Sequence, residues 1–154
     1  MATPSRSRAA AFRTVEEAFA GFAARAALPR MRERLTATLD AGVDLSALRV
    51  LAWIERSGPA RASDLAEAMA LDLSTVSRRV AELEEAGLVT RTRDPDDRRA
   101  SLLETTPSGA ATMERLRAAR RALIEEALAE WPTEDVRRLG ELLARFTGAL
   151  AEAV

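Results

Sequence analysis

The chain has 154 residues, 47% hydrophobic and 31% charged, with a net charge of −1. This composition predicts a folded domain with flanking elements, and the charge by itself does not indicate a polyanion-binding protein. Cysteine, histidine, lysine, asparagine, glutamine and tyrosine are all absent. Their absence excludes disulfides, zinc sites with thiolate or imidazole ligands, and catalysis by a thiol, an imidazole or a Schiff-base lysine.

The N-terminal residues 1–11 are small and basic, without the apolar run of a secretory signal, and are expected to form a flexible tail. No stretch approaches the roughly 18 apolar residues of a membrane helix. A cytoplasmic protein without a membrane partner is therefore expected. The sequence also has no glycine-rich phosphate loop and no nucleophile elbow, so neither an enzyme nor a cofactor site is predicted.

Residues 12–42 are predicted to form helices. Thr14 and Glu17 have the spacing of a capping box, which predicts a helix start, and Pro29 predicts a kink or a restart. Apolar residues at helical spacing form two stripes, Val15, Phe19, Phe22 and Ala26, then Met31, Leu35 and Leu39.

Residues 43–105 carry three short helical patterns and a hairpin. Asp44 is expected to cap a helix over 45–56, Ser63 to cap a helix over 64–69, and a third helix covers 73–86 and ends at Gly87. The side chains predicted to face inward are Leu48, Leu51, Ala52, Leu65, Ala66, Met69, Leu71, Leu73, Val76, Val80 and Leu83. Residues 88–93 and 101–105 are predicted strands, and the turn-rich 94–99 is their charged tip.

Residues 106–154 are predicted to form two long helices. Thr106 and Pro107 are a cap and a first helical residue, and Pro132 separates a helix ending near Trp131 from the last helix, which Thr133 caps. The last helix has an apolar face of Val136, Leu139, Leu142, Leu143, Phe146 and Leu150.

Two helices joined by a tight turn and followed by a hairpin form a winged helix-turn-helix, a DNA-binding plan. The fold class is therefore mainly α with a small β-hairpin wing. Ser74 and Thr75 are predicted at a helix N-terminus, where free amides and the helix dipole attract phosphate. The fork of an arginine suits guanine or a narrow minor groove. Asp97 is expected to orient one of the wing arginines. The candidate DNA-binding residues are Ser63, Ser74, Thr75, Ser77, Arg78, Arg79, Asp97, Arg98 and Arg99.

Two other interpretations remain open at this point. The segment from Arg78 to Arg99 contains six arginines and six acidic residues, so its local net charge is zero. These side chains could therefore form only a solvated surface of ion pairs. A winged helix can also serve protein contacts without a DNA function.

The chain resembles the MarR family (multiple antibiotic resistance regulator) of bacterial transcription factors. The resemblance lies in the motif over residues 63–89, the wing 94–99 and the start of the next helix at 106–109. The resemblance implies an obligate homodimer on a near-palindromic operator, most often a repressor. It implies Ser74, Thr75, Ser77 and Arg78 on the recognition helix, and Arg99 in the wing with Asp97 as its partner. Ala70 departs from the glycine that many such turns carry, so a strained turn is expected.

The resemblance further implies a pocket for a small effector, often a phenolic or other aromatic anion, where the terminal helices meet the lobe. Side chains that could line it are Met31, Leu35, Leu48, Ala52, Met113 and Leu116, which could equally be core. Cysteine-based peroxide sensing is excluded, and metal sensing lacks its usual ligands.

A homodimer is also expected from the residues themselves. The apolar side chains at the two ends exceed what one small lobe can cover, although they could pack within one chain. The predicted interface residues are Val15, Phe19, Phe22, Leu139, Leu142, Leu143, Phe146 and Leu150.

The sequence also predicts which base pair is recognised. Asn and Gln, which usually contact adenine, are absent, so Arg78 is predicted to face a G·C pair.

Overall fold

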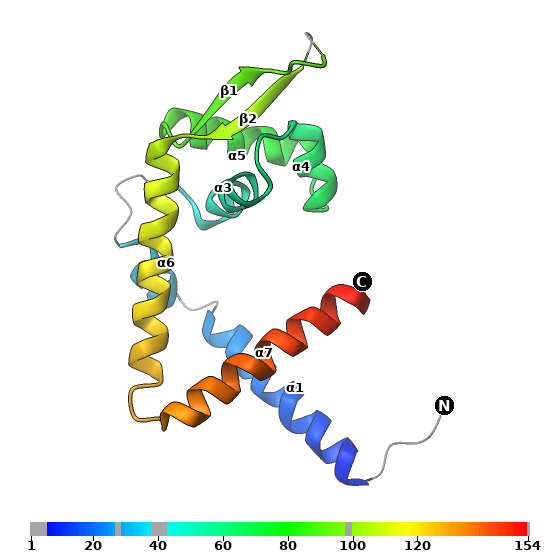
Figure 1. The fold of residues 1–154 in the computed structure, drawn as a ribbon, viewed down its shortest axis with the longest axis vertical. Helices are drawn as coiled ribbons and strands as arrows, with labels where there is room; N and C mark the ends of the chain where they lie inside the picture. The colour runs from blue at the N-terminus through cyan, green and yellow to red at the C-terminus, as the bar shows by residue number, and fades with distance from the viewer. Residues whose placement is uncertain (1–5, 27–28, 38–42, 98–99, 154) are drawn as a thin grey trace. The chain divides into compact units, whose positions relative to one another are not determined.

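The structure is a computed structural model that describes residues 6–26, 29–37, 43–97 and 100–153. Within these ranges the chain forms seven helices and one two-stranded sheet (Figure 1). The helices are α1 (Arg6–Ala26), α2 (Pro29–Thr36), α3 (Leu45–Ser57), α4 (Ala62–Ala68), α5 (Leu73–Glu85), α6 (Pro107–Ala127) and α7 (Thr133–Ala153), and the strands are β1 (Val89–Arg93) and β2 (Ser101–Thr105). The mainly helical fold class with a small hairpin is confirmed.

The first helix begins earlier than the sequence predicts. Helix α1 starts at Arg6, and the Thr14 hydroxyl donates to the Ala10 carbonyl at 3.2 Å inside it. The predicted start at Thr14 is therefore wrong, and part of the predicted tail 1–11 is helical. The alanine-rich residues before Phe12 explain this extension, because alanine has the highest helix propensity. The next helix, α2, begins at Pro29 as expected.

The ends of α3 and α5 agree with the sequence prediction. Asp44 occupies the N-cap position of α3, but its side chain accepts from the Ser46 hydroxyl and makes no capping bond to the helix amides. Gly58 follows α3 with a φ of 83°, and Gly87 follows α5 with a φ of 68°. Glycine reaches these left-handed conformations without the steric cost of a side chain. Helix α6 ends at Ala127 rather than near Trp131, because the Trp131 amide bonds the Leu128 carbonyl in a turn.

The helix-turn-helix differs from the prediction in two details. Helix α4 begins at Ala62 with Arg61 in the capping position, and the Asp64 carboxylate accepts from the Arg61 amide at 3.3 Å, so the predicted Ser63 cap is wrong. Leu71 and Leu73, predicted to face inward, are exposed, Leu73 to 53%. The core contacts α5 only from Val76 onward, so the first turn of that helix carries no buried side chain.

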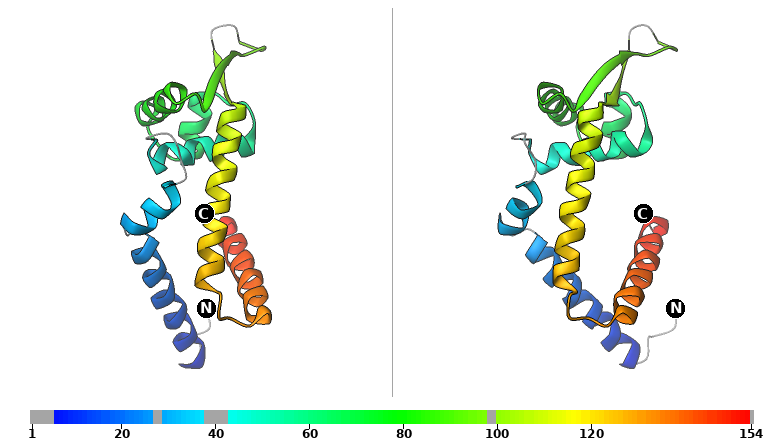
Figure 2. Two further views of the ribbon diagram at one scale, coloured as in Figure 1. Left: turned by 90° about the vertical axis from the view of Figure 1, so that its left-hand side faces the viewer. Right: turned by 60° about the vertical axis from the view of Figure 1, so that its left-hand side comes forward.

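The strands β1 and β2 pair antiparallel, with Val89 opposite Thr105 and Arg93 opposite Ser101. Ala60 adds a single bridge to Leu103, which joins the segment before α4 to the sheet. Figures 1 and 2 show the hairpin projecting past the group of helices α3, α4 and α5. This arrangement is the predicted wing.

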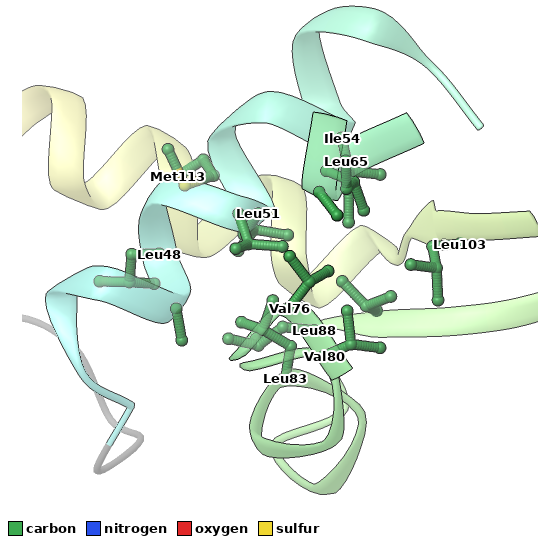
Figure 3. Packing of buried hydrophobic residues seen from close by; sticks show 14 of the residues in the cluster. Leu48, Leu51, Ile54, Leu65, Val76, Val80, Leu83, Leu88, Leu103 and Met113 are labelled. Carbon is green, nitrogen blue, oxygen red and sulfur yellow. The ribbon is translucent and has the colours of Figure 1, made fainter. Parts of the chain in front are cut away.

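One hydrophobic core holds the lobe together. Leu51 of α3 lies at its centre, close to Val76 of α5, and Leu103 of β2 and Met113 of α6 lie at its edges (Figure 3). The largest side chains that are fully buried are Leu48, Leu51, Ile54, Leu65, Leu83, Leu103, Val50, Val76 and Val80. Because α5 is fixed along its buried face, its other face is presented as a rigid surface.

The start of helix α6 packs closely against the segment between α5 and β1. Thr106 caps the helix, since its hydroxyl oxygen accepts from the Gly109 amide at 3.0 Å and donates to the Gly87 carbonyl at 2.7 Å. A Cβ at Gly109 would lie 2.2 Å from the Leu88 carbonyl oxygen. Only glycine allows this approach, so the end of α5, the hairpin and α6 are tied together.

The chain divides into two compact units, Met1–Arg117 and Ala118–Val154. In α7 every side chain over 141–152 is exposed, including four large apolar ones, Leu142, Leu143, Phe146 and Leu150. In α1 Phe12, Val15, Phe19 and Phe22 are exposed as well. Among the described helices none has an apolar stretch long enough to cross a bilayer.

Candidate nucleic-acid interface

Helix α5 has one face buried in the core and another face exposed. Val76, Val80 and Leu83 are buried, whereas Ser77 and Arg78 between the two valines, and Ser74 before them, are exposed. This alternation follows from 3.6 residues per turn, because positions three or four apart share a face. The structure therefore brings the predicted hydroxyls and Arg78 together on one accessible surface of the helix.

Asp72 occupies the N-terminus of α5. Its carboxylate accepts from the Thr75 amide at 2.8 Å, from the Thr75 hydroxyl at 2.7 Å and from the Ser74 hydroxyl. The bonds from the two hydroxyls and the amide hold the pKa of Asp72 far below its ordinary value, so the carboxylate is ionised. The Asp72 carboxylate thus occupies the Thr75 amide and adds a negative charge at the helix start, and the attraction of phosphate to this helix end stays a prediction.

The two neighbouring arginines of α5 have different surroundings. The Arg79 guanidinium lies 3.1 Å from both carboxylate oxygens of Glu82 and 3.7 Å from Asp44, and its side chain is 21% exposed. Arg78 is exposed and has no hydrogen-bond or ion-pair partner among the residues that the structure describes. Arg78 is thus the arginine of this helix whose guanidinium is available to a ligand, and Arg79 belongs to an ion-pair cluster.

Ser63 lies exposed on α4, and its hydroxyl donates to Asp64 at 3.1 Å. Its hydroxyl proton is therefore engaged within α4, and its contact with DNA stays a prediction.

A buried acid anchors the wing. Asp94 is 5% exposed and accepts from the Asp96 amide at 2.8 Å, from the Asp97 amide at 3.2 Å and from the Arg61 guanidinium at 2.7 Å. The Asp96 amide contributes most to lowering the pKa of Asp94, and Arg61 adds to it against the effect of burial. Sequence reasoning missed Arg61 and Asp94. The signal was the first aspartate of Asp94-Pro-Asp-Asp, which is typical of a turn bonded by its own side chain.

The wing tip residues Arg98 and Arg99 lie outside the described residues, so their predicted role and the pairing of Asp97 with one of them are not tested. On the strand before them, Arg91 donates to Glu84 at 2.8 Å, and Arg93 is exposed without a hydrogen-bond or ion-pair partner among the described residues. Arg93 was not predicted as a site residue. Its position on the exposed edge of β1 gives the wing a free cation within the described part.

Most of the predicted effector-pocket residues lie in the core. Leu48, Met113 and Leu116 are buried members of the core cluster, Leu35 and Ala52 pack against it, and Met31 is partly buried. Their packing gives them a structural role in the lobe and leaves the effector pocket a prediction.

Comparison with known proteins agrees with this geometry. Residues 43–101 match the model of the MarR family. The chain is 34% identical to the HTH-type transcriptional regulator YxaD of Bacillus subtilis over 90% of this chain and 94% of YxaD. The chain belongs to the MarR family. Members of this family are DNA-binding transcriptional regulators and not enzymes, so the predicted family and class are confirmed.

Two further proteins are similar to this regulator. The HTH-type transcriptional repressor MdtR of Bacillus subtilis is 29% identical over 76% of each chain. The structure of Streptococcus pneumoniae FabT in complex with DNA superposes with a TM-score of 0.73 over 93% of this chain and 99% of FabT. At 17% identity the likeness to FabT shows the fold alone.

Proposed function

We propose that this MarR-family regulator acts in the cytoplasm as a homodimer that represses transcription from a near-palindromic operator. The observation that carries the proposal is the exposed, unpartnered Arg78 beside Ser77, on a helix whose opposite face is fixed in the core. A recognition helix needs this combination, since a rigid support positions side chains that reach base edges. FabT bound to DNA and the repressor MdtR support the DNA partner and the direction of regulation.

The terminal helices supply the second half of the proposal. Helices α1 and α7 each leave large apolar side chains exposed, and two copies of the chain would cover these faces in one helical bundle. The residues proposed for this interface are Val15, Phe19, Phe22, Leu139, Leu142, Leu143, Phe146 and Leu150. A symmetric pair places two recognition helices about 34 Å apart, one turn of DNA, which matches operator half-sites.

A small ligand between the terminal helices and the lobe would alter that spacing. A ligand that prefers the dimer with the wrong spacing by a few kcal/mol releases the operator. We place this effector, an aromatic anion by family resemblance, near Met31, Leu35, Leu48, Ala52, Met113 and Leu116. DNase footprints on the regulator's own upstream DNA, with and without phenolic acids, test it, and a footprint that no phenolic acid weakens contradicts it.

The contact proposed for Arg78 is a guanine in each half-site, and Arg98 and Arg99 are proposed to reach the minor groove. Arg78→Ala is expected to cost about 1–3 kcal/mol per half-site and to relax the preference at the facing base pair, because a bidentate bond to guanine O6 and N7 is lost. The measurement is sequencing of duplexes that the wild type and the variant select from random DNA. The control is Arg138→Ala, an exposed arginine of α7.

Two results would contradict this assignment. Wild-type half-sites without a preferred guanine would remove the base contact from Arg78. The absence of any enriched sequence would remove the DNA function and leave a winged helix used for protein contacts.

A further inference from the structure

Three side chains at the N-terminus of α5 form one hydrogen-bonded group, here called the acceptor cluster: Asp72, Ser74 and Thr75. Both hydroxyls donate to the Asp72 carboxylate, Thr75 at 2.7 Å, and the Thr75 amide donates to it at 2.8 Å. Asp72 and Ser74 are exposed and Thr75 is half-buried. The cluster therefore lies on the surface that α5 offers to a ligand.

The protons of this cluster can be counted. A hydroxyl has one proton and two lone pairs, and an ionised carboxylate has no proton to give. The lowered pKa of Asp72 keeps its carboxylate ionised. Each hydroxyl therefore uses its only proton in the hydrogen bond that it donates to Asp72. The oxygens of Ser74 and Thr75 can then offer only lone pairs to a bound molecule.

Ser77 provides the contrast on the same helix. It is exposed, and its hydroxyl has no hydrogen-bond partner within the described ranges. A free hydroxyl can rotate to donate or to accept, so it tolerates either kind of base edge. The sequence alone did not distinguish the hydroxyls of Ser74, Thr75 and Ser77. In the structure the first two can only accept a hydrogen bond from a ligand, whereas Ser77 can donate or accept.

We propose that the acceptor cluster selects, in each half-site, a base with a major-groove amino group, which is adenine N6 or cytosine N4. The keto oxygens of guanine and thymine, and phosphate oxygens, are acceptors themselves and are repelled by acceptors. The selectivity is set by Asp72, which orients the two hydroxyls. Asp72 is therefore a positioning residue for base recognition.

This inference rests on the proposed DNA binding and adds to it a complement of the Arg78 contact. Arg78 carries only donors and suits guanine O6 and N7. The chain has no Asn or Gln to read adenine. The acceptor cluster fills that gap at the other end of the exposed face, so one α5 helix presents acceptors at its start and a donor one turn later.

The test begins with duplexes that the full-length wild type selects from random DNA. We expect one position in each half-site to be occupied by adenine or cytosine, with guanine and thymine disfavoured about fivefold or more. Within the selected site, purine deoxyriboside in place of that adenine, or 2-pyrimidinone deoxyriboside in place of that cytosine, removes the amino group. This replacement should weaken binding by a similar factor.

Variants then assign the effect to the cluster. Asp72→Asn keeps the cap, because its Oδ1 still accepts from the Thr75 amide and the Ser74 hydroxyl, but it puts a donating amide where Oδ2 accepted from the Thr75 hydroxyl. The Thr75 proton then becomes free, and the effect of removing the base amino group should weaken. The double variant Ser74→Ala with Thr75→Val should lose the same effect while it keeps the Asp72 carboxylate. If that double variant retains the preference, Asp72 contacts the base itself and the proposal is overturned.

The chain contains a matched control. Asp44-Leu-Ser46 repeats the tripeptide Asp72-Leu-Ser74 at the N-terminus of α3, and the Ser46 hydroxyl donates to Asp44 at 2.9 Å. Ser46→Ala removes the matched hydroxyl and keeps the Asp44–Arg79 pair, so it should leave the amino-base preference unchanged. Enriched sequences without an adenine or cytosine position refute the acceptor cluster alone, whereas no enriched sequence refutes the proposed function as well.

Discussion

The lobe and the terminal helices bury their apolar residues in different ways. In the lobe, side chains such as Leu51, Leu65 and Val76 have no exposed surface. In the terminal helices the same kinds of residue are open, with Phe22 exposed to 70% and Leu143 to 51%. The lobe therefore buries its own apolar side chains, whereas the terminal helices leave theirs exposed, and we propose a second copy of the chain to cover them.

The largest expected effect is on the free energy of unfolding, which the buried core of the lobe should dominate. Leu51→Ala should reduce the free energy of unfolding by about 2–5 kcal/mol, because it leaves a cavity in the centre of the core. The measurement is urea denaturation at fixed protein concentration. Leu71→Ala, the same change at an exposed position of the lobe, should cost less than about 0.5 kcal/mol. Equal losses for the two variants would show that the lobe core does not dominate stability.

The next effect concerns the terminal helices. Leu142→Asp combined with Phe146→Asp should weaken dimerisation by about 2–4 kcal/mol or more, because both positions lie on the apolar face of α7 and charges there would be desolvated. Sedimentation equilibrium measures the association. Ala144→Asp with Ala151→Asp puts two charges on the opposite face of the helix and should leave the dimer intact. A wild-type chain that sediments as a monomer would instead favour packing of these helices within one chain.

The hydrogen bonds that Asp94 accepts, from the Asp96 amide first and then from Arg61, give the stability of the lobe a dependence on pH. The folded pKa of Asp94 lies below the unfolded value of about 4. A lowered pKa stabilises the folded state above the unfolded pKa, and this contribution is lost as the pH falls through the folded pKa. The stability difference between wild type and Asp94→Asn should therefore be constant above about pH 5 and shrink below pH 4.

The matched variant for the wing is Asp96→Asn, since Asp96 is exposed and its carboxylate makes no hydrogen bond or ion pair within the part of the chain that the structure describes. It should change stability little at any pH. A difference for Asp94→Asn that stays constant down to pH 2 would mean that the Asp94 carboxylate is not what anchors the wing.

Comparison of particular residues shows how far sequence reasoning reached. Gly87, Pro29 and Thr106 were predicted because turns, restarts and caps depend on residues adjacent in the chain. The exposure of Leu73 and the burial of Asp94 were missed, since they depend on where the core ends and on a partner 33 positions away. In the site, Arg78 and Ser77 were found by helical spacing, but the ion pairs of Arg79 and the hydrogen bonds that Asp72 accepts required coordinates.

The smallest effect tests the turn between α4 and α5. Ala70 has a φ of 51°, a conformation that costs a residue with a Cβ about 1–2 kcal/mol. Ala70→Gly relieves this strain and loses about 0.5–1 kcal/mol to the flexibility of glycine, so a net gain below about 1 kcal/mol is expected. Urea midpoints measure it. Ala81→Gly within α5 should lose about 1 kcal/mol, and a loss at both positions would argue against strain in the turn.

The central claim is that the terminal helices pair two lobes so that two α5 helices read one duplex. Selection from random DNA by the full-length chain, followed by sequencing, tests it most directly. We expect an inverted repeat whose half-sites lie about 10 base pairs apart, centre to centre, each with a guanine that Arg78→Ala no longer requires. Enrichment of a single unpaired half-site, or of no sequence at all, would contradict the claim.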